Sequence, residues 1–202
     1  TMWFGTYYGG LDYYNPHTDI FEYNNLKLGH AGIGPVISKI IEDKTGRIWI
    51  STEGDGLVSY LPETDAYTYY TKENNTISHN NIKTLYYDDT SSTIWIGTHL
   101  GGLCSYSIDR KEFKHFTIDP SDHTKRSEIV QAIIRHKNIL YLGTLSGVYY
   151  MNLEDGSIQK IHLLDKYIYA VNSLMIDKQD NLWIGGNNLC YYSIKQNYVR
   201  SL

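Results

Sequence analysis

The sequence contains no apolar run of the roughly 18 to 20 residues that a helix needs to cross a lipid bilayer. Its first residues, TMWFGTYYGG, also lack the charged and apolar regions of a secretory signal peptide. We therefore expect no membrane contact by this segment. Any export or anchoring signal is expected to lie outside it.

The sequence has no excess of positive charge. Lys and Arg number 18 against 22 Asp and Glu, the formal net charge is -4, and the basic residues are scattered among the acidic ones. A surface that neutralises a phosphate backbone needs clustered Lys and Arg. We therefore expect no nucleic-acid partner.

Cysteine is scarce, with only Cys104 and Cys190 present, in the similar segments GGLCSY and NNLCYY. These segments belong to repeats that are two apart, so their Cα atoms should lie well beyond the roughly 7 Å limit for a disulfide. We expect two buried free thiols. Two cysteines are too few for a Cys-built zinc site, and the eight His show no metal-ligand spacing, so neither a metal nor a cofactor is predicted.

Tyrosine and glycine are abundant, at 20 and 17 residues, whereas alanine is uncommon. Aromatic side chains suit pleated strands, and glycine suits tight turns between strands. No window shows the 3.6-residue periodicity of an amphipathic helix. The composition therefore predicts an all-β protein.

The strongest feature is an internal repeat. The segments MWFGTYYGGLDYY, IWISTEGDGLVSY, IWIGTHLGGLCSY, LYLGTLSGVYYM and LWIGGNNLCYY recur along the chain, with aromatic residues spaced by 46, 46, 46 and 42 positions. A period of 40 to 50 residues is typical of solenoids, propellers and other repeat arrays. The third repeat divides into four short strands, IKTLYYDD, TIWIGT, GLCSYS and FKHFTI, which are named A to D here.

Four-stranded units at this spacing match the blades of a β-propeller. We predict an all-β propeller of four-stranded antiparallel blades, about five in number, in a single partial domain over 1–202. The first blade is expected to be incomplete, because the chain begins in its strand B. The predicted blades cover 1–26, 35–71, 80–118, 127–162 and 168–202.

The repeated aromatic residues and the acidic turn residues have separate expected roles. The strand-B aromatics should fill the space between adjacent sheets and form the structural blade core; they are Trp3, Trp49, Trp95, Tyr141 and Trp183. Asp43, Asp89 and Asp177 end strand A, where an Asx turn would begin the A-to-B hairpin. The fourth repeat has Arg-His-Lys-Asn over 135–138 instead.

The repeats ISKIIEDKTGRIWISTEGDGLVSY and IKTLYYDDTSSTIWIGTHLGGLCSY resemble the two-component regulator propeller repeat, I-x-x-I-x-E-D-x-x-G-x-I-W-I-G-T-x-x-G-G-L-x-x-Y. The resemblance extends over essentially the whole chain. It implies the periplasmic sensor region of hybrid histidine kinases, in which seven-bladed propellers precede a β-sandwich, a membrane span and kinase modules. It also implies that the parent protein senses glycan fragments, with the remaining blades and the kinase modules as partners in the same chain.

The blade number leaves two arrangements open. Either the chain is an open arc of a larger seven-bladed propeller, or it closes as a small ring. An open arc would expose edge strands and apolar blade faces, which favours a homodimer or aggregation.

In a propeller, the B-to-C and D-to-A connections share one face, and the resemblance implies that ligands bind there. Exposed aromatic rings on this face could stack on sugars, and polar side chains could hydrogen-bond to the hydroxyl groups. The candidate ligand-binding residues are Tyr7, Tyr8, His30, Glu53, Asp55, His79, His99 and His123.

Three functions compete at this stage. A sensor segment that binds an oligosaccharide agrees best with the repeats. A catalytic propeller would need converging carboxylates on its inner strands, and VISKII, IKTLYY, IVQAII and AVNSLMI carry none. We therefore expect no enzyme activity in this segment and no catalytic residues. A propeller that binds only a protein would show the same repeats, because one fold serves many functions.

Overall fold

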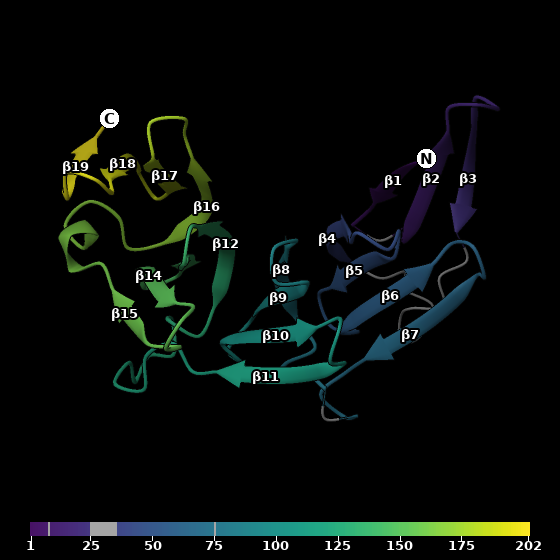
Figure 1. The fold of residues 1–202 in the computed structure, drawn as a ribbon, viewed down its shortest axis with the longest axis horizontal. Coiled ribbons are helices and arrows are strands. Elements are labelled where there is room, and N and C mark those ends of the chain that lie inside the picture. Colours follow the sequence, from purple (N-terminus) through teal and green to yellow (C-terminus); the bar gives the residue numbers. More distant parts are fainter. Residues whose placement is uncertain (8, 25–35, 75) are drawn as a thin grey trace. The chain divides into compact units, whose positions relative to one another are not determined.

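The computed structural model describes residues 1–7, 9–24, 36–74 and 76–202. It contains five antiparallel sheets, one for each repeat, and a single 3-10 turn, η1 (His162–Leu164) (Figure 1). The predicted all-β propeller architecture is confirmed. The chain forms two compact units, the first from 1–96 and 106–113 and the second from 97–105 and 114–202, and each is described by itself.

The first unit contains two whole sheets. The first of these has three strands and the second has four, and in both the strands lie side by side in chain order. The strands are β1 (Met2–Gly5), β2 (Leu11–Asn15) and β3 (Ile20–Asn24), then β4 (Ile37–Glu42), β5 (Ile48–Thr52), β6 (Leu57–Leu61) and β7 (Ala66–Tyr70).

The third sheet contributes residues to both units. Its strands are β8 (Ile82–Asp88), β9 (Thr93–Thr98), β10 (Leu103–Ser107) and β11 (Glu112–Phe116), again neighbours in chain order.

The second unit contains the fourth and fifth sheets. Their strands are β12 (Val130–His136), β13 (Ile139–Thr144), β14 (Gly147–Asn152) and β15 (Ile158–Lys160), then β16 (Val171–Ile176), β17 (Asn181–Gly186), β18 (Leu189–Ser193) and β19 (Tyr198–Ser201). Strand β15 has three residues, two fewer than β7 and β11. The outer strand of the fourth sheet is therefore unusually short.

The first strands of three sheets share an irregularity near their beginning. The pairing register shifts between Ile37 and Lys39, and at the matching places in β12 and β16. Such a bulge bends a strand and re-aims a side chain. In β4 it presents the hydroxyl of Ser38, which donates a 2.7 Å hydrogen bond to the carbonyl of Ile82 and so joins β4 to β8.

The strand-B aromatics of the first unit face the next sheet. Trp3 meets Tyr60 edge to face at 5.6 Å, and Trp49, which is 1% exposed, lies 5.3 Å from Tyr106. Trp95 is also buried, whereas Trp3 is half-buried. These rings fill the space between sheets at the close packing of a protein interior.

In the second unit, Tyr141 takes the place of the tryptophan and is buried in a cluster with Leu182 and Ile184 of the fifth sheet. Trp183 is half-buried and lies 5.1 Å from Tyr191. Cys104 and Cys190 are both buried and are not joined in a disulfide, as predicted.

One turn assignment was wrong. In the third sheet, Asp88 accepts a hydrogen bond from the backbone N–H of Thr90 and another from the hydroxyl of Ser91. Asp88 is 2% exposed. Asp89, which the repeat spacing had indicated, is exposed and meets only the hydroxyl of Thr90, at 3.3 Å. The left-handed residue of this turn is Ser92, so the turn is built from the earlier aspartate.

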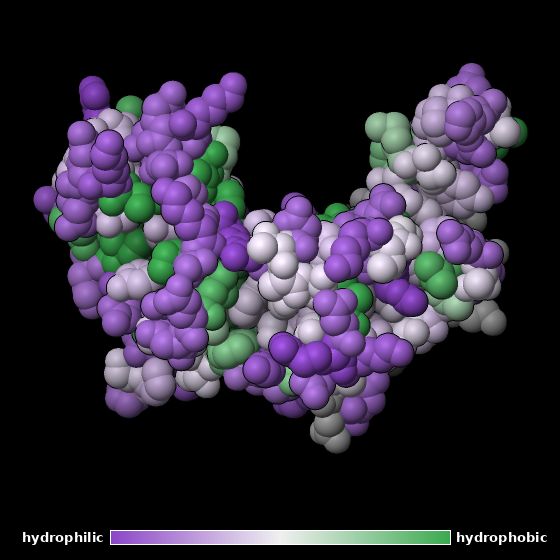
Figure 2. Space-filling model, viewed as in Figure 1, coloured by the Kyte–Doolittle hydropathy of each residue, from purple (hydrophilic) through white to green (hydrophobic). Residues whose placement is uncertain are grey.

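Polar residues cover most of the face shown in Figure 2. Large apolar side chains are nevertheless exposed on the first sheet, including Met2 and Phe21, and on the fifth, including Met175 and Leu189. No helix among the described residues has the length and apolarity to cross a membrane.

Candidate functional site

The B-to-C turns and the D-to-A connections lie at the same end of the sheets, and we call this end the loop face. In the first unit, the N–H groups of Gly54 and Gly56 donate to the carbonyl of Asn80, at 3.2 and 3.0 Å. In the second unit, the N–H of Gly102 donates to the carbonyl of Glu128 at 3.0 Å. Backbone bonds between connections thus give each unit a fixed loop face.

An ion pair forms the centre of the loop face in the first unit. Lys83, on the inner strand β8, donates from Nζ to Oε1 of Glu53 at 3.0 Å, and the two side chains are 18% and 33% exposed. The backbone of Glu53 also forms a β-bridge with Asn81. A partly exposed ion pair adds little to stability but provides charged donors and acceptors in a fixed place.

The connection that precedes β8 supplies further polar groups. The Nδ1 atom of His79 accepts a 3.0 Å hydrogen bond from the N–H of Asn81, which fixes the orientation of the imidazole. The side-chain oxygen of Asn81 is buried and has no partner among the described residues. A buried acceptor without a donor is uncommon in proteins.

A second amide, that of Asn80, has hydrogen-bond partners at both its oxygen and its nitrogen. Its oxygen accepts from the N–H of Lys72 at 2.7 Å, and its nitrogen donates to Glu73 at 2.8 Å. This donated bond is the main cause that lowers the pKa of Glu73 below its ordinary value. Asn80 therefore stabilises the connection, whereas the side-chain oxygen of Asn81 stays without a partner among the described residues.

The other predicted residues of the first unit lie close by or outside the described residues. Asp55 shares the turn of Glu53 and is half-buried, with its N–H donating to the hydroxyl of Thr52 at 2.9 Å. Tyr7 is 66% exposed on the turn between β1 and β2. Tyr8 and His30 lie outside the described residues.

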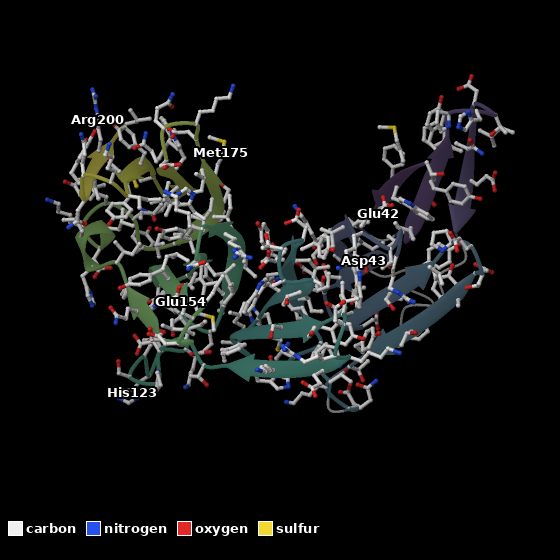
Figure 3. All side chains as sticks on the ribbon, in the orientation of Figure 1. Glu42, Asp43, His123, Glu154, Met175 and Arg200 are labelled. Carbon is white, nitrogen blue, oxygen red and sulfur yellow. The ribbon has the colours of Figure 1, made fainter. Side chains whose placement is uncertain are left out.

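The second unit carries the two remaining candidates. His99 is half-buried on the turn between β9 and β10, beside Leu100, whose φ of +69° is unusual for a bulky residue. His123 is exposed on the connection between β11 and β12 (Figure 3). The structure thus divides the predicted residues between two loop faces, with Glu53, Asp55 and His79 on the first and His99 and His123 on the second.

The connection that carries His123 is held rigidly by acidic residues. Asp122 accepts hydrogen bonds from Thr124 and from the N–H of Ser127, and these bonds, above all the one from the Thr124 hydroxyl, hold its pKa well below the ordinary range. Asp119 accepts from the hydroxyl of Tyr149 at 3.2 Å. These carboxylates therefore order the loop.

Glu128 is another buried structural carboxylate. It is 4% exposed, and its Oε1 accepts from the N–H groups of Ile118 and Asp119 at 3.0 and 3.1 Å. Among the described residues, no group of three or more His, Cys, Asp and Glu side chains could hold a metal ion.

Sequence reasoning missed Lys83 and Asn81. Lys83 lies within an inner strand whose sequence has no carboxylate to mark it as a site, and Asn81 is one of several polar residues in the segment TKENNTISHNN. The signal that could have found them is position, because the last residues before strand A and the first residues within it meet the preceding B-to-C turn here.

The sequence was compared with known families and proteins. The two component regulator propeller family model matches residues 32–54 and 162–188. These segments fall in the second and the fifth repeats, and the predicted resemblance is confirmed. No curated protein matches the chain.

Solved structures share the fold. The chain is similar to the extracellular domain of the hybrid two component system BT3049 from B. thetaiotaomicron, with a TM-score of 0.77 and 20% identity over 99% of this chain and 26% of that one. It is similar to the extracellular domain of BT4673 from the same organism, with a TM-score of 0.81 and 18% identity over 99% and 26% of the two chains.

PorZ, a surface component of the type-IX secretion system of Porphyromonas gingivalis, gives a TM-score of 0.70 at 14% identity over 99% of this chain and 32% of that one. The chain thus spans between a quarter and a third of the length of these proteins. At such identities the likeness establishes the propeller fold.

Proposed function

We propose that this chain, which carries two component regulator propeller repeats, is an extracytoplasmic, non-catalytic sensor segment. It binds a glycan-derived oligosaccharide and signals to a histidine kinase. The ligand binds at the loop face of the first unit. The periplasm is the proposed location, and the remaining blades and the kinase modules of the parent protein are the proposed partners.

The observation that carries the binding site is the partly exposed ion pair of Glu53 and Lys83, beside the backbone bridge that joins Glu53 to Asn81. Sugar hydroxyl groups both donate and accept hydrogen bonds. The site offers them a carboxylate and an ammonium group, and the unpartnered oxygen of Asn81 lies buried on the residue that pairs with Glu53. Such preorganised polar groups give orientation and specificity to a ligand site.

The experiment is a thermal-shift screen of the chain against a panel of mono- and oligosaccharides. A ligand at 100 times its Kd that binds only the folded state adds about 2.7 kcal/mol to the free energy of unfolding. We expect one class of glycan to raise the Tm, and we expect the variants Glu53→Gln and Asn81→Ala to abolish this shift.

Glu63→Gln provides the matched control, since Glu63 is an exposed carboxylate on the C-to-D turn at the other end of the same sheet. It should leave the shift unchanged. If the Tm shift persists in Glu53→Gln and Asn81→Ala, the ligand does not bind at this loop face. The absence of any shift would overturn the glycan proposal.

A protein partner is the second candidate. It is supported by the exposed apolar side chains Met2 and Phe21 on the first sheet, which are 59% and 65% exposed. Apolar side chains grouped on a surface mark contacts with other proteins. Self-association measured by analytical ultracentrifugation, and reduced by Phe21→Ser, would favour this function.

A further inference from the structure

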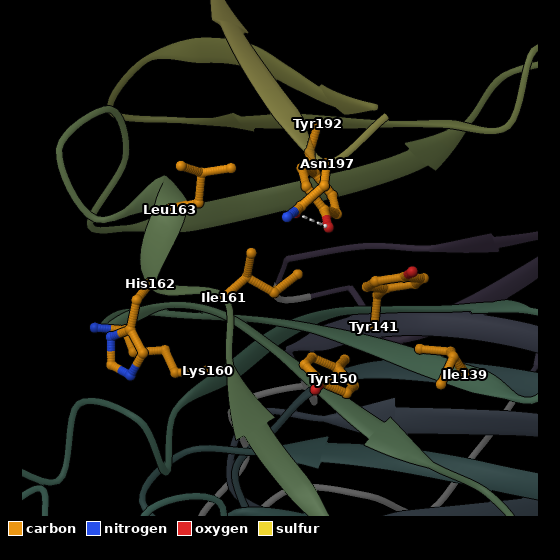
Figure 4. Close-up of a pocket in the computed structure, with 9 residues that line it drawn as sticks. All are labelled: Ile139, Tyr141, Tyr150, Lys160, Ile161, His162, Leu163, Tyr192 and Asn197. Carbon is orange, nitrogen blue, oxygen red and sulfur yellow. Dashed lines mark hydrogen bonds between the residues drawn. The ribbon is translucent and has the colours of Figure 1, made fainter. Parts of the chain in front are cut away.

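A cavity of about 340 Å³ lies between the fourth and fifth sheets of the second unit (Figure 4). None of the residues that line it is a predicted ligand-binding residue. Its walls include Ile139, Tyr141, Tyr150, Ile161, Tyr192 and Asn197.

The corresponding junction between the second and third sheets is filled by aromatic rings. Trp49 lies 5.8 Å from Tyr70 and 5.3 Å from Tyr106, and Phe113 lies 5.3 Å from Tyr70 and 4.6 Å from Tyr106. Four rings in mutual contact leave little space there, as is usual in protein interiors.

Three smaller side chains replace these rings around the cavity. Tyr141 is the strand-B aromatic in the place of Trp49. Ile161 takes the place of Tyr70. The N–H of Ile161 donates to the carbonyl of Val148 on strand C of the fourth sheet, and Tyr70 pairs with the residue that matches Val148 on strand C of the second sheet.

Val199 takes the place of Phe113, since each lies two residues after the left-handed residue of the C-to-D turn. Tyr150 lies opposite Tyr141 where Ser59 lies opposite Trp49, so one ring is added. The cavity remains in spite of it.

The hydroxyl groups of the cavity are only partly satisfied. Tyr150 donates to Gln159 at 2.7 Å and Tyr192 donates to Asn197 at 2.9 Å, so both oxygens can still accept. Tyr141 is 5% exposed, and its hydroxyl bonds to none of the described residues. The Tyr141 hydroxyl is therefore open at the cavity surface, where a ligand can donate to it or accept from it.

The charge at the cavity is balanced. Lys160 is part of the lining, but its Nζ lies 2.9 Å from Asp165, which also meets Nδ1 of His162 at 3.1 Å. An anionic ligand would meet this carboxylate as well as the lysine. The walls therefore favour a neutral ligand with apolar faces.

We propose that this cavity binds one small neutral aromatic ring that carries a hydroxyl group, a ligand of the phenol class. Its faces contact the tyrosine rings and the two isoleucines, and its hydroxyl pairs with that of Tyr141. The volume is sufficient, because an apolar cavity of about 150 Å³ already accepts a benzene ring. A pyranose presents hydroxyl groups around its whole edge and would need more fixed polar partners than these walls offer.

The experiment measures binding of phenol and resorcinol to the chain by ligand-observed NMR titration, with benzene, cyclohexanol and glucose as comparison probes. We expect the phenols to bind most tightly. Tyr141→Phe should weaken phenol binding about fivefold, the value of one neutral hydrogen bond. Ile161→Tyr, which restores the side chain found at the filled junction, should abolish it.

Tyr106→Phe at the filled junction is the matched control and should leave phenol affinity unchanged. Glu53→Gln should do so too, which separates this site from the proposed glycan site. No binding of either phenol to the wild-type chain would overturn the proposal. So would glucose binding that is lost in Ile161→Tyr, or phenol binding that survives both cavity variants.

Discussion

The indole Nε1 of Trp49 donates a 2.8 Å hydrogen bond to Oδ2 of Asp43, six residues earlier in the chain. The other oxygen of Asp43 accepts from the N–H groups of Thr45 and Arg47, at 2.8 and 3.3 Å. One carboxylate therefore closes the A-to-B turn and satisfies the buried indole. Asp177 holds Trp183 in the same way at 2.7 Å.

Asp43→Ala is expected to destabilise the protein by about 2 to 3 kcal/mol, because a buried indole N–H and two turn N–H groups lose a charged acceptor. The measurement is the free energy of unfolding in urea. Asp89→Ala is the control, at the matching position of the third repeat, and its effect should stay within about 0.5 kcal/mol because Asp89 is exposed. Equal losses from the two variants would contradict the assignment.

Acid should weaken the fifth sheet through Asp177. The hydrogen bond from Trp183, followed by that from the N–H of Asn181, lowers the pKa of Asp177 from 3.8 to about 2. A carboxyl group whose pKa is lower in the folded state stabilises the protein fully above its unfolded pKa, and this stability is lost as the pH falls to the folded pKa. The window is therefore about pH 4 to pH 2.

The measurement is urea unfolding of the wild type and of Asp177→Asn at pH 5, 3 and 2. Asp119, Asp122 and Asp155 also have lowered pKa values, so both proteins should lose stability in acid. The difference between them isolates Asp177 and should shrink from pH 5 to pH 2. A constant difference would mean that Asp177 does not titrate in this window.

Lys111→Gly should stabilise the protein by roughly 0.5 to 1 kcal/mol, because Lys111 has a φ of +56° in the C-to-D turn, where glycine avoids the strain of a side chain. Gly156, with a φ of +74°, occupies the matching position of the fourth sheet, and a Cβ there would meet no atom closer than 3.9 Å. Gly156→Lys should therefore cost a similar amount. Thermal unfolding of both variants measures the two changes in stability. If both variants gain stability, or both lose it, the prediction is wrong.

Gly102→Ala should destabilise by at least about 2 kcal/mol. Its φ is +70°, and an added Cβ would lie 2.4 Å from Oε2 of Glu128 and 2.5 Å from the carbonyl oxygen of Phe116. Gly46, with a φ of +77°, has no atom within 4 Å of such a Cβ, so Gly46→Ala should cost only about 1 kcal/mol of backbone strain. Urea unfolding distinguishes the two, and a larger loss for Gly46→Ala would show that crowding at Gly102 is unimportant.

The loop-face candidates show where prediction from sequence stops. Glu53 and His79 can be predicted from the sequence because they lie in connections that a propeller places on one face. Lys83 and Asn81 cannot, since their importance depends on the register between β8 and the turn after β5. A pairing between two sheets leaves no periodic signal within either segment.

The sequence by itself determined the repeat, the antiparallel four-stranded sheets and the places of the strand-B aromatics, because strand alternation and turn chemistry act over a few residues and recur in every repeat. Only the tertiary structure decided that Asp88 rather than Asp89 closes the third turn, that Asn81 pairs with the backbone of Glu53, and that a cavity opens beside Tyr141. These features arise where side chains from different sheets meet. Their volumes and hydrogen bonds combine there in a way that no single repeat contains.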